Sequence, residues 1–288
     1  MNKKVHQNRS EIQVKKYSGE IAPFEQDKLI SSLQRSGAKA DVIEQVVQEV
    51  EKMLYNGIST KEIYKKAFSL LKKKARPIAA RYNLKKALFE FGPTGFPFES
   101  FIAELLHAKG FQAKTDQLVQ GNCVQHEVDV VAEKDNKHFM VECKFHSDRG
   151  RFCDVKIPLY IQSRFKDVEK VWRNKKGHQN KFHQGWVATN TRFTSDAIQY
   201  GKCIGLHLIS WDYPQNESLK NWIDETHTHP VTALTTISRK EKQALLDSGI
   251  ILCRQLCTEK KGLEVLNLSD SRQRKVMEEA RGICEYHS

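Results

Sequence analysis

The chain has 288 residues, of which 39% are hydrophobic and 28% are charged, a composition that predicts a globular protein of two or three domains. No run of residues approaches the ~20 consecutive apolar positions of a membrane span, which excludes a membrane protein. The first residues are polar and basic and lack an apolar core, so we expect no signal peptide. Seven cysteines without zinc-finger spacing predict free thiols, and hence a cytoplasmic protein.

The net charge is +12, and most of it lies in the first third of the chain. Residues 1–92 contain 19 Lys and Arg against 10 Asp and Glu, whereas residues 93–225 contain 18 against 17. A basic protein favours a polyanionic partner. Because the excess lies outside 93–225, the charge indicates phosphate binding without singling out DNA.

Residues 1–11 are polar and predict a flexible N-terminus, and residues 12–92 predict a small domain. Two short apolar stretches on either side of Gly19 predict a strand pair with this glycine in the turn. Asp41, with Glu44 three residues later, and Ser59 or Thr60, with Glu62 close behind, are the expected N-caps of two helices. In all, four helices are predicted, in the segments 25–36, 42–54, 60–71 and 77–91.

This strand pair followed by helices resembles the ATP-cone, a nucleotide-binding regulatory module of ribonucleotide reductases and their repressor. The family pattern V-x-K-R-D-G-(x)4-[FY]-x3-K-[IL] corresponds to residues 14–29, with Tyr17 and Ser18 in place of the arginine and aspartate. Lysines are point-charge partners of phosphate, and glycine allows close approach of the backbone. On spacing alone, solvated surface lysines would be the favoured interpretation, and the match of the flanking residues reverses it. The resemblance implies ATP or dATP as a regulatory ligand, with nucleotide-binding residues Val14, Lys16, Gly19, Lys28 and Thr60.

A boundary is expected at Gly92–Pro97, where two glycines and two prolines cannot continue a helix. The following region, 93–225, alternates helices and strands. In its predicted helix 158–171, Arg164 and Asp167 are available as an internal ion pair. For Gln162 and Arg164, ordinary helix surface and a role beside the active site are equal alternatives. A strand–helix–strand crossover near its end implies parallel strands, and hence a mixed sheet within an α/β/α core. The expected elements are helices 98–109, 158–171 and 195–202, and strands 112–115, 127–132, 139–145, 185–189 and 204–210.

The segment 126–146 predicts a β-hairpin with a two-residue turn at Asp135-Asn136. Counting back from this turn places Asp129 opposite Glu142, with Lys144 two residues further along the same face. Like charges that face each other across two strands are destabilising. A pair of carboxylates on a half-buried sheet therefore predicts a bound cation. The alternative is a chance set of charges on a solvated hairpin.

The pattern D-(x)12-E-x-K resembles the PD-(D/E)XK nuclease superfamily, in its restriction-endonuclease (Mrr-like) branch, although Val128 replaces the proline. Helix 98–109 resembles the opening helix of that branch, and Glu99 matches its acid, with Glu104 as the alternative. The resemblance implies that Lys144 positions the attacking water or stabilises the developing charge on the phosphate. It also implies Mg²⁺ (or Mn²⁺) held by Asp129, Glu142, the carbonyl of Cys143, and Glu99.

Residues 226–288 follow a predicted linker near 224–230 and predict a small helical domain. The stretch around Gly249 loosely resembles a helix-hairpin-helix module, which binds the DNA backbone. A packing or partner-docking domain is an equal alternative. The predicted helices lie over 238–248, 252–257, 262–266 and 271–283.

Together these patterns predict a multidomain α/β protein: a helical ATP-cone with a small β-hairpin, a nuclease core and a helical C-terminal domain. The function predicted is an ATP- or dATP-regulated, Mg²⁺-dependent endonuclease of the restriction type. Its partners would be DNA and a nucleotide, with a homo-oligomer as an open possibility. The alternative is a nucleotide-sensing, DNA-binding regulator with a catalytically idle nuclease fold. The residues do not exclude a structured RNA as substrate.

Overall fold

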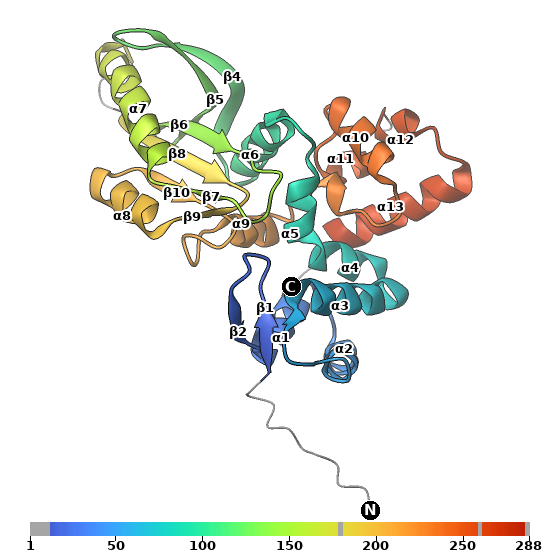
Figure 1. The fold of residues 1–288 in the computed structure, drawn as a ribbon. Coiled ribbons are helices and arrows are strands. Elements are labelled where there is room, and N and C mark those ends of the chain that lie inside the picture. The colour runs from blue at the N-terminus through green and yellow to red at the C-terminus, as the bar shows by residue number, and fades with distance from the viewer. Residues whose placement is uncertain (1–11, 178–180, 259–260, 286–288) are drawn as a thin grey trace, which may run out of the picture.

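The computed structural model describes residues 12–177, 181–258 and 261–285 (Figure 1). The segment 1–11, predicted to be flexible, lies outside the described residues. The chain forms an N-terminal helical part with a small sheet, a central α/β part and a C-terminal helical part (Figure 1). This is the multidomain α/β architecture that the sequence predicts. Throughout the described ranges, no helix is both long and apolar enough to cross a membrane.

The N-terminal part begins with the predicted strand pair. Strand β1 (Gln13–Lys15) lies between the antiparallel β2 (Ile21–Pro23) and the parallel β3 (Ile58–Ser59), a third strand that the sequence patterns did not indicate. The helices enclose a core that includes the fully buried Leu33 and Val46. They are α1 (Gln26–Arg35), α2 (Ala40–Glu51), α3 (Thr60–Lys74) and α4 (Arg76–Tyr82). The following α5 (Leu84–Ala87) and the 3₁₀ turn η2 (Leu88–Glu90) contribute leucines to the core that contains α6.

Two of the predicted helix boundaries need correction. Of the two expected caps of α3, Ser59 is the N-cap, in a capping box with Glu62, and Thr60 is the first residue of the helix. Asp41 is not an N-cap, because α2 begins one residue before it; the carboxylate lies in the first turn, where the helix dipole still favours it. The single helix predicted over 77–91 is interrupted at Asn83. The buried side chain of Asn83 accepts a hydrogen bond of 2.5 Å from the Tyr64 hydroxyl.

The central part contains a five-stranded mixed sheet in the order β10-β8-β6-β5-β4. Strands β4, β5 and β6 pair antiparallel, whereas β6, β8 and β10 pair parallel, which confirms the predicted crossover. A small parallel pair, β7 (Phe152–Cys153) and β9 (Arg192–Phe193), lies beyond β6 and β8. The strands of the main sheet are β4 (Gln112–Gln120), β5 (Gln125–Lys134), β6 (Lys137–Lys144), β8 (Phe182–Thr189) and β10 (His207–Ile209).

Helices cover both faces of this sheet (Figure 1). On one face, α6 (Phe96–Ala108) and α9 (Leu219–Thr226) pack apolar side chains against Val141 of β6. On the other face, α7 (Lys156–Asn174) packs against Met140, with α8 (Ser195–Ile204) beside it. Because adjacent residues of a strand point to opposite faces, Met140 and Val141 separate the two cores. The result is the predicted α/β/α arrangement.

The C-terminal part is packed closely against the other two. Its apolar residues join the same core as α5 and α6, and residues 228 and 229 are buried, so the segment predicted as a linker is not an exposed connector. An isolated bridge between Pro230 and Leu252 holds this segment against the C-terminal helices. The elements are η3 (Val231–Ala233), α10 (Arg239–Asp247), α11 (Cys253–Thr258), α12 (Lys261–Leu266) and α13 (Asp270–Cys284).

Candidate nuclease site and nucleotide pocket

The β5–β6 hairpin has the register that the sequence predicts. Asp135 and Asn136 form the turn with φ angles of 49° and 58°, and Lys134 faces Lys137. Two consecutive left-handed residues are the geometry of a tight hairpin turn, in which Asn and Asp are favoured. The regular pairing then continues to Val130 opposite Val141 and stops one step before Asp129 and Glu142.

The ladder is interrupted at Asp129 by its own side chain. The Asp129 carboxylate accepts a hydrogen bond of 2.6 Å from the backbone N–H of Cys143. Val128 packs in the core beneath α7, whereas Val130 packs beneath α6, so the alternation of faces breaks between them. On the neighbouring strand β4, Asp116 has a φ of 52° at the same level. Such bulges reorient side chains and are common next to active sites.

Glu142 is the most deeply buried of the predicted acids, with 3% of its surface exposed. One carboxylate oxygen accepts a hydrogen bond of 2.5 Å from Lys144 Nζ, and the other accepts one of 2.5 Å from Arg164 Nη1. Arg164 comes from α7 and also donates to the carbonyl of Glu127. Two cations therefore neutralise a carboxylate that would otherwise be costly to bury.

A role beside the active site was one of two equal expectations for Arg164, and the structure brings it to Glu142, a partner that the sequence did not specify. The internal pair of Arg164 with Asp167 is not formed, because Asp167 instead accepts hydrogen bonds from the Cys123 N–H and contacts the His126 ring at 2.8 Å. Sequence spacing cannot reveal the Glu142–Arg164 contact, since it depends on how α7 crosses the sheet. The only signal in the sequence was an arginine in a helix that follows the E-x-K strand.

Glu99 lies in the first turn of α6, and the neighbouring carboxylates make a negative charge on Glu99 electrostatically unfavourable. Burial, followed by the charges of Asp129, Glu127 and Glu142, raises the pKa of Glu99 to about 7. Burial and the charge of Glu142 likewise raise the pKa of Asp129 to about 6, although the Cys143 N–H opposes this shift. Burial alone would lower the pKa of Lys144, but its hydrogen bond to Glu142 raises it. The predicted acids therefore influence one another as a single group.

This donor set fits a hard divalent cation. Carboxylate and carbonyl oxygens are the ligands that Mg²⁺ and Mn²⁺ prefer, and a cation among mutually repelling acids would relieve their raised pKa values. Asp129, Glu142 and Glu99, with the carbonyl of Cys143, are the residues that would hold it. Across the described ranges, no three acidic, histidine or cysteine side chains already surround a common point. A cation held by Glu142 would compete with Lys144 and Arg164 for the charge of this carboxylate.

The other predicted acid, Glu104, lies elsewhere. Its carboxylate accepts a hydrogen bond of 2.9 Å from Arg254 of the C-terminal part. Glu104 is five residues after Glu99, so the two side chains leave α6 in different directions. Of the two acids proposed for this role, Glu99 is the one whose charge is coupled to Asp129.

Four of the five predicted nucleotide-binding residues line one pocket of about 200 Å³ in the N-terminal part: Val14, Lys16, Lys28 and Thr60. Gly19 is at the tip of the adjoining turn with a φ of 87°, a conformation that favours glycine. Lys16 and Lys28 form ion pairs with Glu20 and Glu25 at 2.8 and 2.7 Å. Because these pairs are exposed, they contribute little and are readily exchanged for a phosphate.

Comparison with known proteins identifies each part of the chain. The family model of the ATP cone domain matches residues 12–85, and that of the restriction endonuclease matches residues 93–213. The AF1548-like C-terminal domain, a family that the sequence patterns did not indicate, matches residues 229–284. The fold and the site thus define a restriction-endonuclease-like chain with an N-terminal ATP cone, as the two resemblances predicted.

Two relatives place the chain more closely. An uncharacterized protein of Archaeoglobus fulgidus is 36% identical over 183 residues, which cover 63% of this chain and 99% of the relative. The crystal structure of AF1548, a protein of unknown function, has a TM-score of 0.54 and 34% identity, covering 67% of this chain and 99% of that one. The chain belongs to the AF1548-like family. About a third of it has no counterpart in either relative.

Proposed function

We propose that this chain is a nucleotide-regulated endonuclease that hydrolyses DNA phosphodiester bonds with Mg²⁺ or Mn²⁺. The observation that supports the proposal is the coupled group of Asp129, Glu142, Glu99 and Lys144 at the irregular end of the β5–β6 hairpin. A structural hairpin gains nothing from burying acids whose charges raise one another's pKa values. A metal-dependent phosphodiesterase requires such a group.

Each residue has a role that follows from its position. Asp129 is held in place by the Cys143 N–H, and Glu142 is held by Lys144 and Arg164. When bound, Mg²⁺ supplies an activated water and polarises the scissile phosphate. The ammonium of Lys144 would orient the attacking water or stabilise the developing negative charge on the phosphate.

The direct test is plasmid cleavage by purified protein with Mg²⁺ or Mn²⁺. Asp129→Asn retains an oxygen that accepts the Cys143 N–H but loses the charge, and Lys144→Ala removes the ammonium. We expect both variants to lose on the order of 10²-fold or more in cleavage rate while they still bind DNA in a fluorescence anisotropy assay. Lys137→Ala, an exposed residue at the other end of β6, is the matched control. Full activity of both site variants would contradict the proposal.

We further propose that the ATP cone binds ATP or dATP and changes the activity of the nuclease, with a change of oligomeric state as one route. The cone pocket and its two lysines support this part. Calorimetric titration of the full chain with ATP and dATP tests it. Lys28→Ala should weaken binding several-fold, whereas Lys52→Ala, exposed on another part of the cone, should not. A cytoplasmic location remains a prediction from the free thiols.

The second candidate is a DNA-binding regulator whose nuclease fold is idle. It is favoured by one observation: Glu142 is already neutralised by Lys144 and Arg164. In that case the wild-type chain would bind DNA in a nucleotide-dependent manner but would not cleave it with any divalent ion. Calorimetry with Mn²⁺ separates the two functions, because an idle site would not bind the ion.

A further inference from the structure

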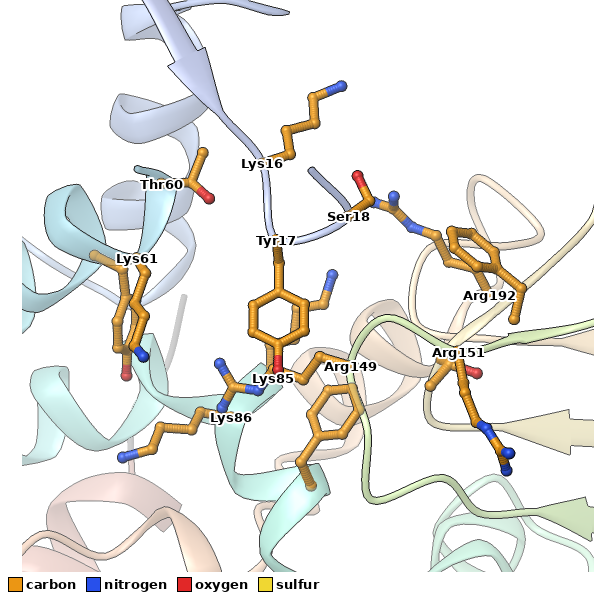
Figure 2. A pocket seen from close by; sticks show the side chains of 14 residues that line it. Lys16, Tyr17, Ser18, Thr60, Lys61, Lys85, Lys86, Arg149, Arg151 and Arg192 are labelled. Atoms are coloured by element: carbon orange, nitrogen blue, oxygen red, sulfur yellow. The ribbon is translucent and has the colours of Figure 1, made fainter. Parts of the chain in front are cut away.

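A larger pocket, of about 540 Å³, lies between the ATP cone and the nuclease part (Figure 2). One wall is the β1–β2 turn with the start of α3, and the base is formed by α5 and η2. The opposite wall is made of residues 149–152, which follow the catalytic strand β6, and residues 191–192, which follow β8. The two parts meet closely here: a Cβ added at Gly150 would lie 3.9 Å from the Tyr17 ring.

The lining of this pocket is strongly cationic. It contains four lysines from the cone part and three arginines from the nuclease part, Arg149, Arg151 and Arg192, and no acidic residue of the described chain lines it. Figure 2 shows these side chains arranged around the opening between the Tyr17 turn and the 149–151 loop. So many like charges in one cavity are unfavourable without an anion.

Several of these cations have no carboxylate partner within ion-pair distance among the described residues. Lys61, Lys85, Arg149 and Arg151 form no such pair, although the Arg149 guanidinium lies 5.2 Å from the Phe89 ring centre. Burial, together with the charge of Arg192, lowers the pKa of Lys85 to about 8. A bound phosphate would supply the missing negative charge and raise the pKa of this lysine again.

The shape of the pocket favours a nucleotide over a single phosphate ion. Its volume is within the range of small-molecule sites, and aromatic side chains such as Tyr17, Tyr64 and Phe89 contribute to its lining. It also shares Lys16, Thr60 and Tyr64 with the smaller cone pocket, so the two cavities adjoin. A ligand seated in the cone pocket could therefore extend its charged end into the larger one.

We propose that a nucleoside triphosphate bound by the cone places its polyphosphate in this pocket, where Arg149, Arg151 and Arg192 of the nuclease part bind it together with the cone lysines. The inference rests on the proposed nucleotide regulation and adds how the signal reaches the nuclease. The ligand itself bridges the two domains. Guanidinium groups suit this role because they bind phosphate oxygens in a bidentate manner.

The segments that carry these arginines also hold the end of the catalytic strand. Thr189 Oγ1 donates to the carbonyl of Lys144 at 2.7 Å, and the Thr191 N–H donates to Thr189 Oγ1 at 3.3 Å. The Asn190 side chain exchanges two hydrogen bonds, of 2.8 and 2.9 Å, with the backbone of His146. A phosphate that repositions residues 149–151 or 191–192 therefore acts on the backbone that carries Lys144. These hydrogen bonds give the coupling between the nucleotide site and the metal site a physical basis.

The test uses the full chain and the paired variant Arg149→Ala/Arg151→Ala, titrated calorimetrically with a non-hydrolysable ATP analogue, ADP and AMP. We expect triphosphate affinity to fall on the order of 10- to 100-fold, with a much smaller effect on AMP. The matched control is Lys156→Ala/Lys170→Ala, which removes two exposed cations of the nuclease part outside the pocket. The analogue should also change the cleavage rate of the wild type and of the control, but not of the arginine variant.

The outcomes separate this inference from the function on which it rests. If the wild type binds no nucleotide, the proposed regulation fails and the bridging fails with it. If the wild type and the arginine variant bind the triphosphate equally well, only the bridging is wrong. If the variant loses DNA affinity at unchanged nucleotide affinity, the pocket is part of a nucleic-acid surface, and the inference is overturned.

Discussion

The acids of the nuclease site are poised to titrate near neutral pH. Glu99 and Asp129 have pKa values raised to about 7 and about 6, first by burial and then by neighbouring carboxylates. Because the folded-state pKa values exceed those of the unfolded chain, these groups favour the folded state most at low pH. Without metal, that contribution is lost as the pH rises through about 6 and 7.

Protons and metal should therefore compete at this site. We expect Mn²⁺ affinity to increase between pH 5.5 and pH 7.5, because ligation requires the ionised carboxylates. Glu99→Gln removes the group with the higher pKa. The affinity of this variant for Mn²⁺ should therefore be lower than that of the wild type at pH 7.5 and should depend less on pH. Calorimetry at several pH values measures both effects. An affinity that is independent of pH in the wild type would show that Glu99 and Asp129 do not bind the ion.

Arg164 should stabilise the metal-free protein and oppose metal binding. Arg164→Gln leaves the buried Glu142 carboxylate with one cation fewer. Because the Arg164 side chain is itself only 13% exposed, the free energy of unfolding should fall by about 3 kcal/mol. Mn²⁺ should bind this variant more tightly, since it no longer displaces the guanidinium. The control on the same helix is Arg173→Gln, whose pair with Glu169 involves an arginine that is 67% exposed. There the loss should stay below about 1 kcal/mol.

At the scale of elements, the β5–β6 hairpin shows what a sequence can and cannot predict. The two-residue turn determined the register correctly, because hairpin loop length and strand pairing are linked by local geometry. The bulge at Asp129 and the contact of Arg164 with Glu142 were not predictable in the same way. Both depend on how separate elements pack against one another, and the alternation of residues along one strand gives no information about that packing. The same applies to β3, whose two residues pair only with β1.

The turn itself offers a test of this element. Asn136 has a φ of 58°, which asparagine and glycine tolerate and β-branched residues do not. Asn136→Val should lower the free energy of unfolding by about 1–2 kcal/mol, whereas Asn136→Gly should be nearly neutral. Urea denaturation measures the difference. If the valine variant keeps both its stability and its metal-dependent cleavage, the turn does not control the placement of Asp129 and Glu142.

At the scale of the whole molecule, the C-terminal part connects the other two. Lys242 pairs with Glu90 at 2.8 Å, next to the junction of cone and nuclease. Arg81 of α4 donates to the carbonyl of Gly282 at 2.7 Å and to that of Ser36 at 2.8 Å. These contacts were invisible in the sequence because they join residues up to 201 positions apart. Helix patterns predicted the separate parts and not their assembly.

Helix α13 approaches α4 closely at a glycine. A Cβ at Gly282 would lie 2.6 Å from the Pro77 side chain, too close without a shift of one helix. Gly282→Ala should therefore reduce the free energy of unfolding by about 1–3 kcal/mol. Helix propensity alone predicts the opposite sign, a gain of about 1 kcal/mol. Urea denaturation measures the change in the free energy of unfolding. A loss of stability would show that α13 and α4 approach each other in solution as closely as in the structure, and a gain would contradict it.

The α4–α13 contact also limits how the cone can respond to a ligand. A hinge motion of the cone as a rigid body would break the hydrogen bond from Arg81 to the Gly282 carbonyl and separate Pro77 from Gly282. Arg35 of α1 also pairs with Asp224 of α9 at 3.6 Å, whereas in the described ranges no hydrogen bond or ion pair joins the β1–β2 turn itself to the nuclease part. Nucleotide binding is thus expected to leave the radius of gyration of the single chain unchanged, so that any change in scattering would report a change of oligomeric state. Its effect should instead appear as slower hydrogen exchange in residues 16–20 and 145–151.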